Sequence, residues 1–90
     1  MLKYIKGSNW YRIYSDGWIE QGGSGRNTGY STTQYFSFHK AFSNINYTVI
    51  VTPKQGGDSW EFWGKPSSTT QFATGGFHND TSFQWIAYGY

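Results

Sequence analysis

Carboxylates are the first side chains to consider for chemistry, because two of them a few ångströms apart can hydrolyse a glycosidic bond. The sequence has five, at Asp16, Glu20, Asp58, Glu61 and Asp80. Asp58 and Glu61 are three residues apart, so an extended strand points them to opposite faces. Asp16 and Asp80 lie in segments typical of turns. The pattern predicts no catalytic pair, and we expect a protein that is not an enzyme.

The sequence has neither the motif of a dinucleotide-binding loop nor a full set of metal ligands. The segment Gly23-Ser24-Gly25 lacks the third glycine and the following helix of a dinucleotide-binding loop. The chain has no cysteine and two isolated histidines, His39 and His78, whereas a zinc site needs three or four ligands. The alternative is a metal site on the axis of a homotrimer, where three copies of one histidine would come together. We otherwise expect no cofactor and no bound metal.

Aromatic rings beside polar side chains are the better candidates, because sugars stack on rings and hydrogen-bond to nearby polar groups. Two tryptophans follow a Gly-rich segment, a tyrosine ends another, and a His-Asn pair precedes the last strand. The candidate ligand-binding residues are Trp60, Trp63, Asp58, Lys65, Tyr30, Arg26, His78 and Asn79. An extended strand would point Trp60 and Trp63 to opposite faces, one buried and one free to stack. The alternative is that either tryptophan belongs to the core.

The composition predicts one small all-β domain to carry these residues. The chain has 90 residues, of which 22% are aromatic and 13% charged, and leucine occurs once. Few helix formers and many aromatic and β-branched residues exclude a helical bundle. A net charge of +2 from scattered Lys and Arg argues against nucleic-acid binding. No segment is apolar enough to span a membrane or to form the core of a signal peptide, so we expect neither membrane insertion nor Sec export.

Turn residues divide the chain into strands. Asp16-Gly17 predicts a hairpin turn, residues 22–29 are expected to form a flexible Gly-rich loop, and residues 1–8 to form an N-terminal arm or connection ahead of a domain over 9–90. Alternation puts Phe36 and Phe38 in the core. The expected strands are 10–14, 18–21, 33–38, 47–52, 69–77 and 83–89, with 47–52 central to its sheet. For residues 60–63 two interpretations stay open, a short strand or a loop with aromatic side chains at its tip.

The last expected strand is apolar on both faces. Phe83, Trp85 and Ala87 share one face, and Ile86 and Tyr88 share the other. A lone sandwich of this size should expose one face of such a strand. We therefore expect sister copies to cover Ile86 and Tyr88, with a surface-exposed Tyr88 as the alternative. A small core without disulfide or metal also favours oligomerisation.

Four segments in order resemble the C-terminal domain of bacteriophage and prophage tail fibres: Ser15–Gly23, Phe36–Phe42, Tyr47–Pro53 and Phe83–Tyr90. The resemblance covers residues 10–90 and departs from the family pattern over 55–65.

The resemblance implies an antiparallel β-sandwich of six strands, similar to H-type lectins, in a homotrimeric fibre of the virion. It also implies a non-catalytic receptor-binding domain that attaches to bacterial surface carbohydrate, such as lipopolysaccharide or capsule. The alternative is a structural domain that holds three chains in register and caps the fibre end.

Overall fold

The structure is a computed structural model that describes residues 2–27, 33–53, 59–77 and 81–90. These residues form eight strands and no helix, so no helix among them could cross a membrane. The strands are β1 (Leu2–Lys6), β2 (Asn9–Ile13), β3 (Ile19–Asn27), β4 (Gln34–Ser37), β5 (Thr48–Pro53), β6 (Ser59–Pro66), β7 (Gln71–Phe77) and β8 (Thr81–Gly89). The all-β prediction is confirmed.

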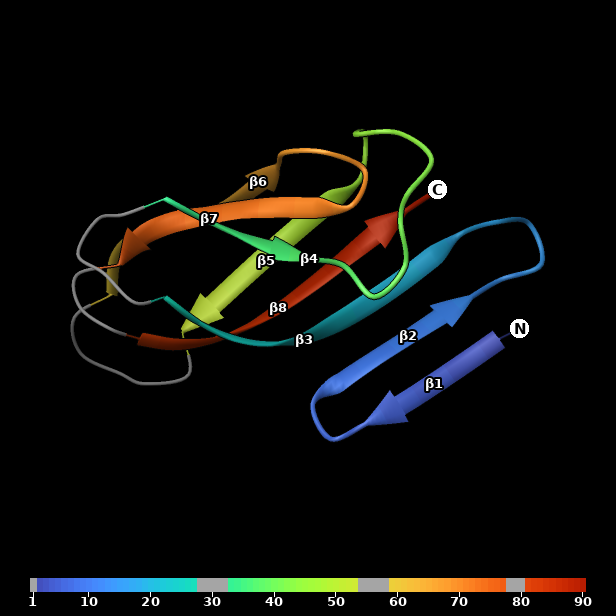
Figure 1. The fold of residues 1–90 in the computed structure, drawn as a ribbon, viewed down its shortest axis with the longest axis horizontal. Coiled ribbons are helices and arrows are strands. Elements are labelled where there is room, and N and C mark those ends of the chain that lie inside the picture. Colours follow the sequence, from blue (N-terminus) through green and yellow to red (C-terminus); the bar gives the residue numbers. More distant parts are fainter. Residues whose placement is uncertain (1, 28–32, 54–58, 78–80) are drawn as a thin grey trace.

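The strands form two antiparallel sheets that pack face to face (Figure 1). The larger sheet has the order β1-β2-β3-β8-β5 and the smaller one the order β4-β7-β6. The smaller sheet lies over β5 and β8, whereas the β1–β2 hairpin extends beyond it. The larger sheet therefore has an inner face toward the core and an outer face toward solvent.

Aromatic rings fill the space between the sheets. Phe72 and Phe83 are fully buried. The centroids of Phe36 and Phe83 lie 5.0 Å apart at 80°, and those of Phe38 and Phe42 lie 4.9 Å apart at 89°. These edge-to-face contacts bring the positive edge of one ring to the negative face of the next. The prediction that Phe36 and Phe38 pack in the core is confirmed.

Two strands are additional to the six that the resemblance implied. Residues 2–6 form β1, which pairs along its whole length with β2, so the N-terminal segment is a strand of the larger sheet rather than a connection ahead of it. All five side chains of β1 are exposed because no second layer covers them. Residues 60–63 lie in β6, which settles the open alternative in favour of a strand.

The Gly-rich segment is a strand where the sequence indicated a flexible loop. Residues 22–27 continue β3 and pair with β8 as far as Thr81. Large rings from neighbouring strands occupy the space that side chains would fill. A Cβ on Gly22 would lie 2.6 Å from Nε1 of Trp10, and one on Gly25 would lie 2.5 Å from Cζ of Phe83. Glycine is needed here for close approach rather than for flexibility.

Strand β5 lies at an edge of the larger sheet, and the prediction that it is central was wrong. The middle strand of this sheet is β3, and β8 lies between β3 and β5 and pairs with both. The β-branched residues of β5 bury one face only: Val49 and Val51 face the core, whereas Ile50 is 48% exposed. Pro53, which has no N–H to donate, is compatible with an edge strand.

Candidate functional site

An apolar row crosses the outer face of the larger sheet from strand to strand. The register aligns Ile5 with Trp10, Trp10 with Gly22, Gly22 with Ile86, and Ile86 with Ile50. The exposed fractions of Ile5, Ile50 and Ile86 are 60%, 48% and 38%. Exposed large apolar residues in register are unusual on a small soluble domain and indicate a surface that contacts something else.

The turn between β2 and β3 places Trp18 at one end of this outer face. Gly17 has a φ of 95°, which confirms the predicted Asp-Gly turn. Its N–H donates to the carbonyl of Tyr14 at 2.9 Å, and the N–H of Trp18 donates to Oδ1 of Asp16 at 3.0 Å. Since Trp18 precedes Glu20 by two residues in extended backbone, both side chains lie on the same face.

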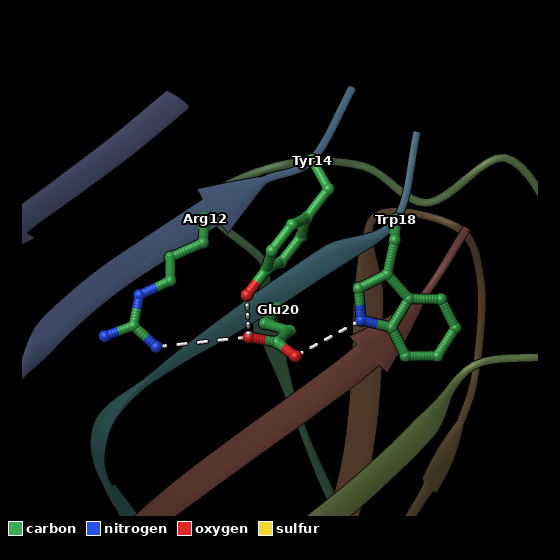
Figure 2. A network of polar contacts seen from close by, with 4 residues as sticks. All are labelled: Arg12, Tyr14, Trp18 and Glu20. Carbon is green, nitrogen blue, oxygen red and sulfur yellow. Dashed lines mark hydrogen bonds and ion pairs between the residues drawn. The ribbon is translucent and has the colours of Figure 1, made fainter. Parts of the chain in front are cut away.

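The Glu20 carboxylate contacts three side chains, through two hydrogen bonds and one ion pair (Figure 2). The Tyr14 hydroxyl donates to Oε1 at 3.1 Å, and Nε1 of Trp18 donates to Oε2 at 3.3 Å. Nη1 of Arg12 lies 3.9 Å from Oε1, which makes an ion pair between half-exposed groups. The hydrogen bond to Glu20 raises the pKa of Tyr14. The contacts fix the carboxylate and turn the polar edge of the indole toward it.

Two tyrosines hold the Trp18 ring from the other side. Its centroid lies 5.8 Å from that of Tyr88, and 5.1 Å from that of Tyr90 at 79°. The Tyr90 hydroxyl donates to Oδ2 of Asp16 at 3.2 Å, and this hydrogen bond raises the pKa of Tyr90. Tyr90 remains 50% exposed. We call Arg12, Tyr14, Trp18, Glu20, Tyr88 and Tyr90 the Trp18 cluster.

Arg12 connects the Trp18 cluster to the middle of the apolar row. Its Cζ lies 5.3 Å from the ring centroid of Trp10, so one guanidinium contacts both Glu20 and an aromatic face. Beyond Trp10 the outer face is hollowed to a volume of about 310 Å³. The hollow is lined by Ser8, Trp10, Gly23, Ile50, Thr52, Gln84, Trp85 and Ile86, and we call it the central hollow.

The smaller sheet carries two of the residues singled out from the sequence. Gly64 faces the core, where a Cβ would lie 2.7 Å from Val51, so Trp63 and Lys65 on either side of it face outward. Trp63 is half-buried against Gly75, and Nζ of Lys65 lies 5.3 Å from its ring centroid. The structure thus brings Trp63 and Lys65 together, on the face opposite to the Trp18 cluster.

The other sequence-based candidates do not join them within the described residues. Arg26 is exposed near the end of β3, on the larger sheet. Tyr30, Asp58, His78 and Asn79 lie outside the described residues, and so does the side chain of Trp60. The register of β6 shifts between Ser59 and Trp63, so simple alternation does not determine which way the two tryptophans point.

Ile86 and Tyr88, the expected interface residues, both lie on the outer face of the larger sheet. Tyr88 is half-buried and its ring contacts Trp18 of the same chain. The side chain of Tyr88, which we expected sister copies to cover, is therefore partly covered by Trp18 of its own chain. Ile86 stays 38% exposed and lines the central hollow. The subunit interface itself stays a prediction.

Four residues of the Trp18 cluster were not among the site residues expected from the sequence: Arg12, Tyr14, Trp18 and Glu20. Trp18 and Glu20 are two apart beside a recognisable turn, which was enough to place them on one face. Their partners Tyr88 and Tyr90 come from the other end of the chain, and only the pairing of β3 with β8 brings them close.

Within the part of the chain that the structure describes, no three His, Cys, Asp or Glu side chains gather as metal ligands would. His39 instead lies with Nε2 2.8 Å from the carbonyl oxygen of Gly22 and its ring 5.4 Å from that of Trp85. The Trp18 cluster has a different chemistry. Its indole ring lies beside the carboxylate of Glu20 and the guanidinium of Arg12, an arrangement that can stack a sugar and bind its hydroxyls.

No protein-family model and no curated protein matches this sequence. Two solved structures do match the fold. The N-truncated R2-type pyocin tail fibre aligns with a TM-score of 0.83 at 16% identity, over 99% of this chain and 37% of that one. The P. aeruginosa R2 pyocin fibre comprising C-terminal residues 323–691 aligns with a TM-score of 0.82 at 17% identity, over 99% of this chain and 25% of that one.

The chain has a pyocin tail-fibre fold. It spans about a third and a quarter of the lengths of the two fibre chains, so it corresponds to one part of each. The similarity to tail fibres that four sequence segments indicated is thus found again in the arrangement of the strands. At this level of identity the likeness concerns the fold alone, and no role of a residue in the Trp18 cluster follows from it.

Proposed function

We propose that the chain is a non-catalytic receptor-binding domain of a phage or prophage tail fibre in the virion. It attaches, in a lectin-like manner, to carbohydrate of the bacterial surface such as lipopolysaccharide or capsule. The pyocin tail-fibre fold supports the fibre context. The observation that carries the binding role is Trp18, a half-buried ring that Glu20, Tyr88 and Tyr90 fix at one end of the outer face of the larger sheet.

The composition of the outer face favours a polar ligand over a protein partner. Charged groups stand directly beside the apolar row, because Lys3, Arg12 and Glu20 occupy the next register row. The centre of a subunit interface is depleted in charged residues. A saccharide, in contrast, needs both an apolar ring to stack on and charged or polar groups that accept and donate hydrogen bonds.

The second candidate function is a structural one, in which the domain holds a homotrimer together and caps the fibre end. The exposure of Ile5, Ile50 and Ile86 favours it, since sister chains would bury them. Ile86 and Tyr88 would then be interface residues. In the receptor-binding proposal the chain is also a homotrimer, but its subunit contacts leave this face open.

An adsorption assay on host cells with the purified chain tests the proposed function. We expect Glu20→Gln to weaken adsorption, because it removes the charge that Arg12 and two donors share, without altering the size of the side chain. Trp18→Ala should weaken it further by removing the stacking surface. Both variants must keep cooperative unfolding transitions for these losses to count.

Trp63→Ala is the matched tryptophan variant on the opposite face, and the proposal expects it to adsorb like the wild type. Loss of adsorption in Trp63→Ala alone would move the binding site to Trp63 and Lys65 on the smaller sheet, where the sequence analysis placed it. A wild-type chain that binds no host cell and no surface glycan would favour the structural function.

A further inference from the structure

The central hollow adjoins the Trp18 cluster on one continuous face. Along the outer side of β8 the residues run from Tyr88 in the cluster to Ile86 and Gln84 in the hollow. At a rise of about 3.3 Å per residue, Tyr88 and Gln84 are about 13 Å apart along the strand. Arg12 links the two regions, since it contacts Glu20 on one side and Trp10 on the other.

The lining of the central hollow is neutral and mixed in polarity. Trp10, Ile50 and Ile86 provide apolar surface, and Ser8, Thr52 and Gln84 provide hydroxyl and amide groups, with no charged side chain among the lining residues. Thr52 and Gln84 are exposed at its rim. One aromatic wall with neutral donors and acceptors suits an uncharged sugar, and a volume of about 310 Å³ is within the usual range for small-ligand sites.

The hollow is built into the sheet by the residues beneath it. Gly22 lets the indole of Trp10 lie against β3, because a Cβ there would come within 2.6 Å of its Nε1 and 2.8 Å of the carbonyl oxygen of Trp85. The Ser24 and Ser8 hydroxyls are hydrogen-bonded at 2.9 Å and tie β3 to the β1–β2 turn. The aromatic wall is therefore held in place before any ligand arrives.

We propose that the Trp18 cluster and the central hollow are two subsites for one extended saccharide chain. This inference rests on the proposed function and deepens it, because it names the ligand as an internal stretch of a polysaccharide rather than a single terminal sugar. One sugar stacks at Trp18 within reach of Glu20, and an uncharged sugar further along the chain lies against Trp10 between Gln84 and Thr52.

The test is calorimetric binding of uncharged oligosaccharides of increasing length, prepared by partial hydrolysis of a host polysaccharide. For the wild type, affinity should rise by about tenfold from the shortest bound fragment to one long enough to reach Gln84. Gln84→Ala should lower the affinity for long fragments by about threefold to tenfold, the range for one lost hydrogen bond, and leave the shortest fragment unaffected. Gln71→Ala is the control, since Gln71 is an exposed glutamine on the smaller sheet.

Equal affinity of the wild type for short and long fragments would overturn the two-subsite inference and leave the proposed function standing. The same holds if Gln84→Ala and Gln71→Ala bind every length alike. Binding of neither oligosaccharides nor host cells would instead refute the proposed function itself. If the wild type buries the hollow in a self-associated form that binds no oligosaccharide, the occupant is a sister chain and the inference is wrong.

Discussion

The buried side-chain amide of Gln21 binds the backbone of Lys40 at both its N–H and its carbonyl. Nε2 of Gln21 donates to the Lys40 carbonyl at 2.8 Å, and Oε1 accepts from the Lys40 N–H at 3.1 Å and from the His39 N–H at 2.9 Å. Gln21 is fully buried. It therefore fastens the chain that leaves β4 to the first part of β3, next to Glu20 of the Trp18 cluster.

Gln21→Ala should destabilise the domain by about 2–4 kcal/mol, because backbone groups at residues 39 and 40 lose their partners in a buried place. Urea unfolding followed by tryptophan fluorescence measures the change. Gln84→Ala makes the same substitution at an exposed site on β8 and should stay within about 0.5 kcal/mol of the wild type. Equal effects of the two would show that the Gln21 contacts contribute little to stability.

Gly25→Ala should cost about 1–3 kcal/mol, because the added methyl meets the ring of fully buried Phe83 and the core has no room to move it. The thermal midpoint checks this. Ser24→Ala on the same strand, at a half-buried site, removes one exposed hydrogen bond and should be nearly neutral. A Gly25→Ala variant as stable as the wild type would mean that the segment can move away from Phe83, as the flexible loop expected from sequence would.

The difference between the Gly-rich segment and its expected loop shows what local reasoning leaves out. Glycine was interpreted by its own conformational freedom, whereas Gly22 and Gly25 are required by rings on other strands. The faces of β8 and the Asp16-Gly17 turn depend on neighbouring residues, and both were predicted correctly. The edge position of β5 depends on which strands pair, which alternation alone does not specify.

In the candidate site, too, contacts between sequence neighbours could be predicted, whereas contacts that depend on strand pairing could not. Trp18 and Glu20 could be placed on one face from their spacing, but nothing local indicates that Tyr90 reaches Asp16 or that Tyr88 contacts Trp18. Choosing Trp60 and Trp63 instead followed from the Gly-rich segment before them, which is typical of an exposed loop. The structure places residues 59–66 in a strand, and Trp63 on the smaller sheet.

Tyr47→Phe should lower the free energy of unfolding at neutral pH, and this loss should disappear at alkaline pH. The Tyr47 hydroxyl donates to the carbonyls of Ser68 and Gln71 at 2.8 and 2.9 Å. Burial raises the pKa of Tyr47 above its usual value, so its contribution to stability is full below about pH 10 and is lost as the pH rises through the folded-state pKa. The difference in unfolding free energy between wild type and variant should therefore narrow above about pH 10.

Urea midpoints over an alkaline pH series measure this difference. Both proteins share every other tyrosine, so general alkaline destabilisation cancels in the comparison. A difference that stays constant with pH would show that the hydroxyl is as easily ionised in the folded chain as in the unfolded one.

Ile5→Asp should leave the sedimentation coefficient and the adsorption to cells unchanged. Ile5 is 60% exposed at the edge of the apolar row but does not line the central hollow, so a saccharide-binding face tolerates a charge there. If sister chains cover this face instead, a buried carboxylate without a partner would dissociate them.

Analytical ultracentrifugation at several concentrations distinguishes a saccharide-binding face from a subunit interface. The control is Ile45→Asp, at an equally exposed isoleucine between β4 and β5. Dissociation by Ile5→Asp but not by Ile45→Asp would establish the apolar row as a subunit interface and favour the structural function.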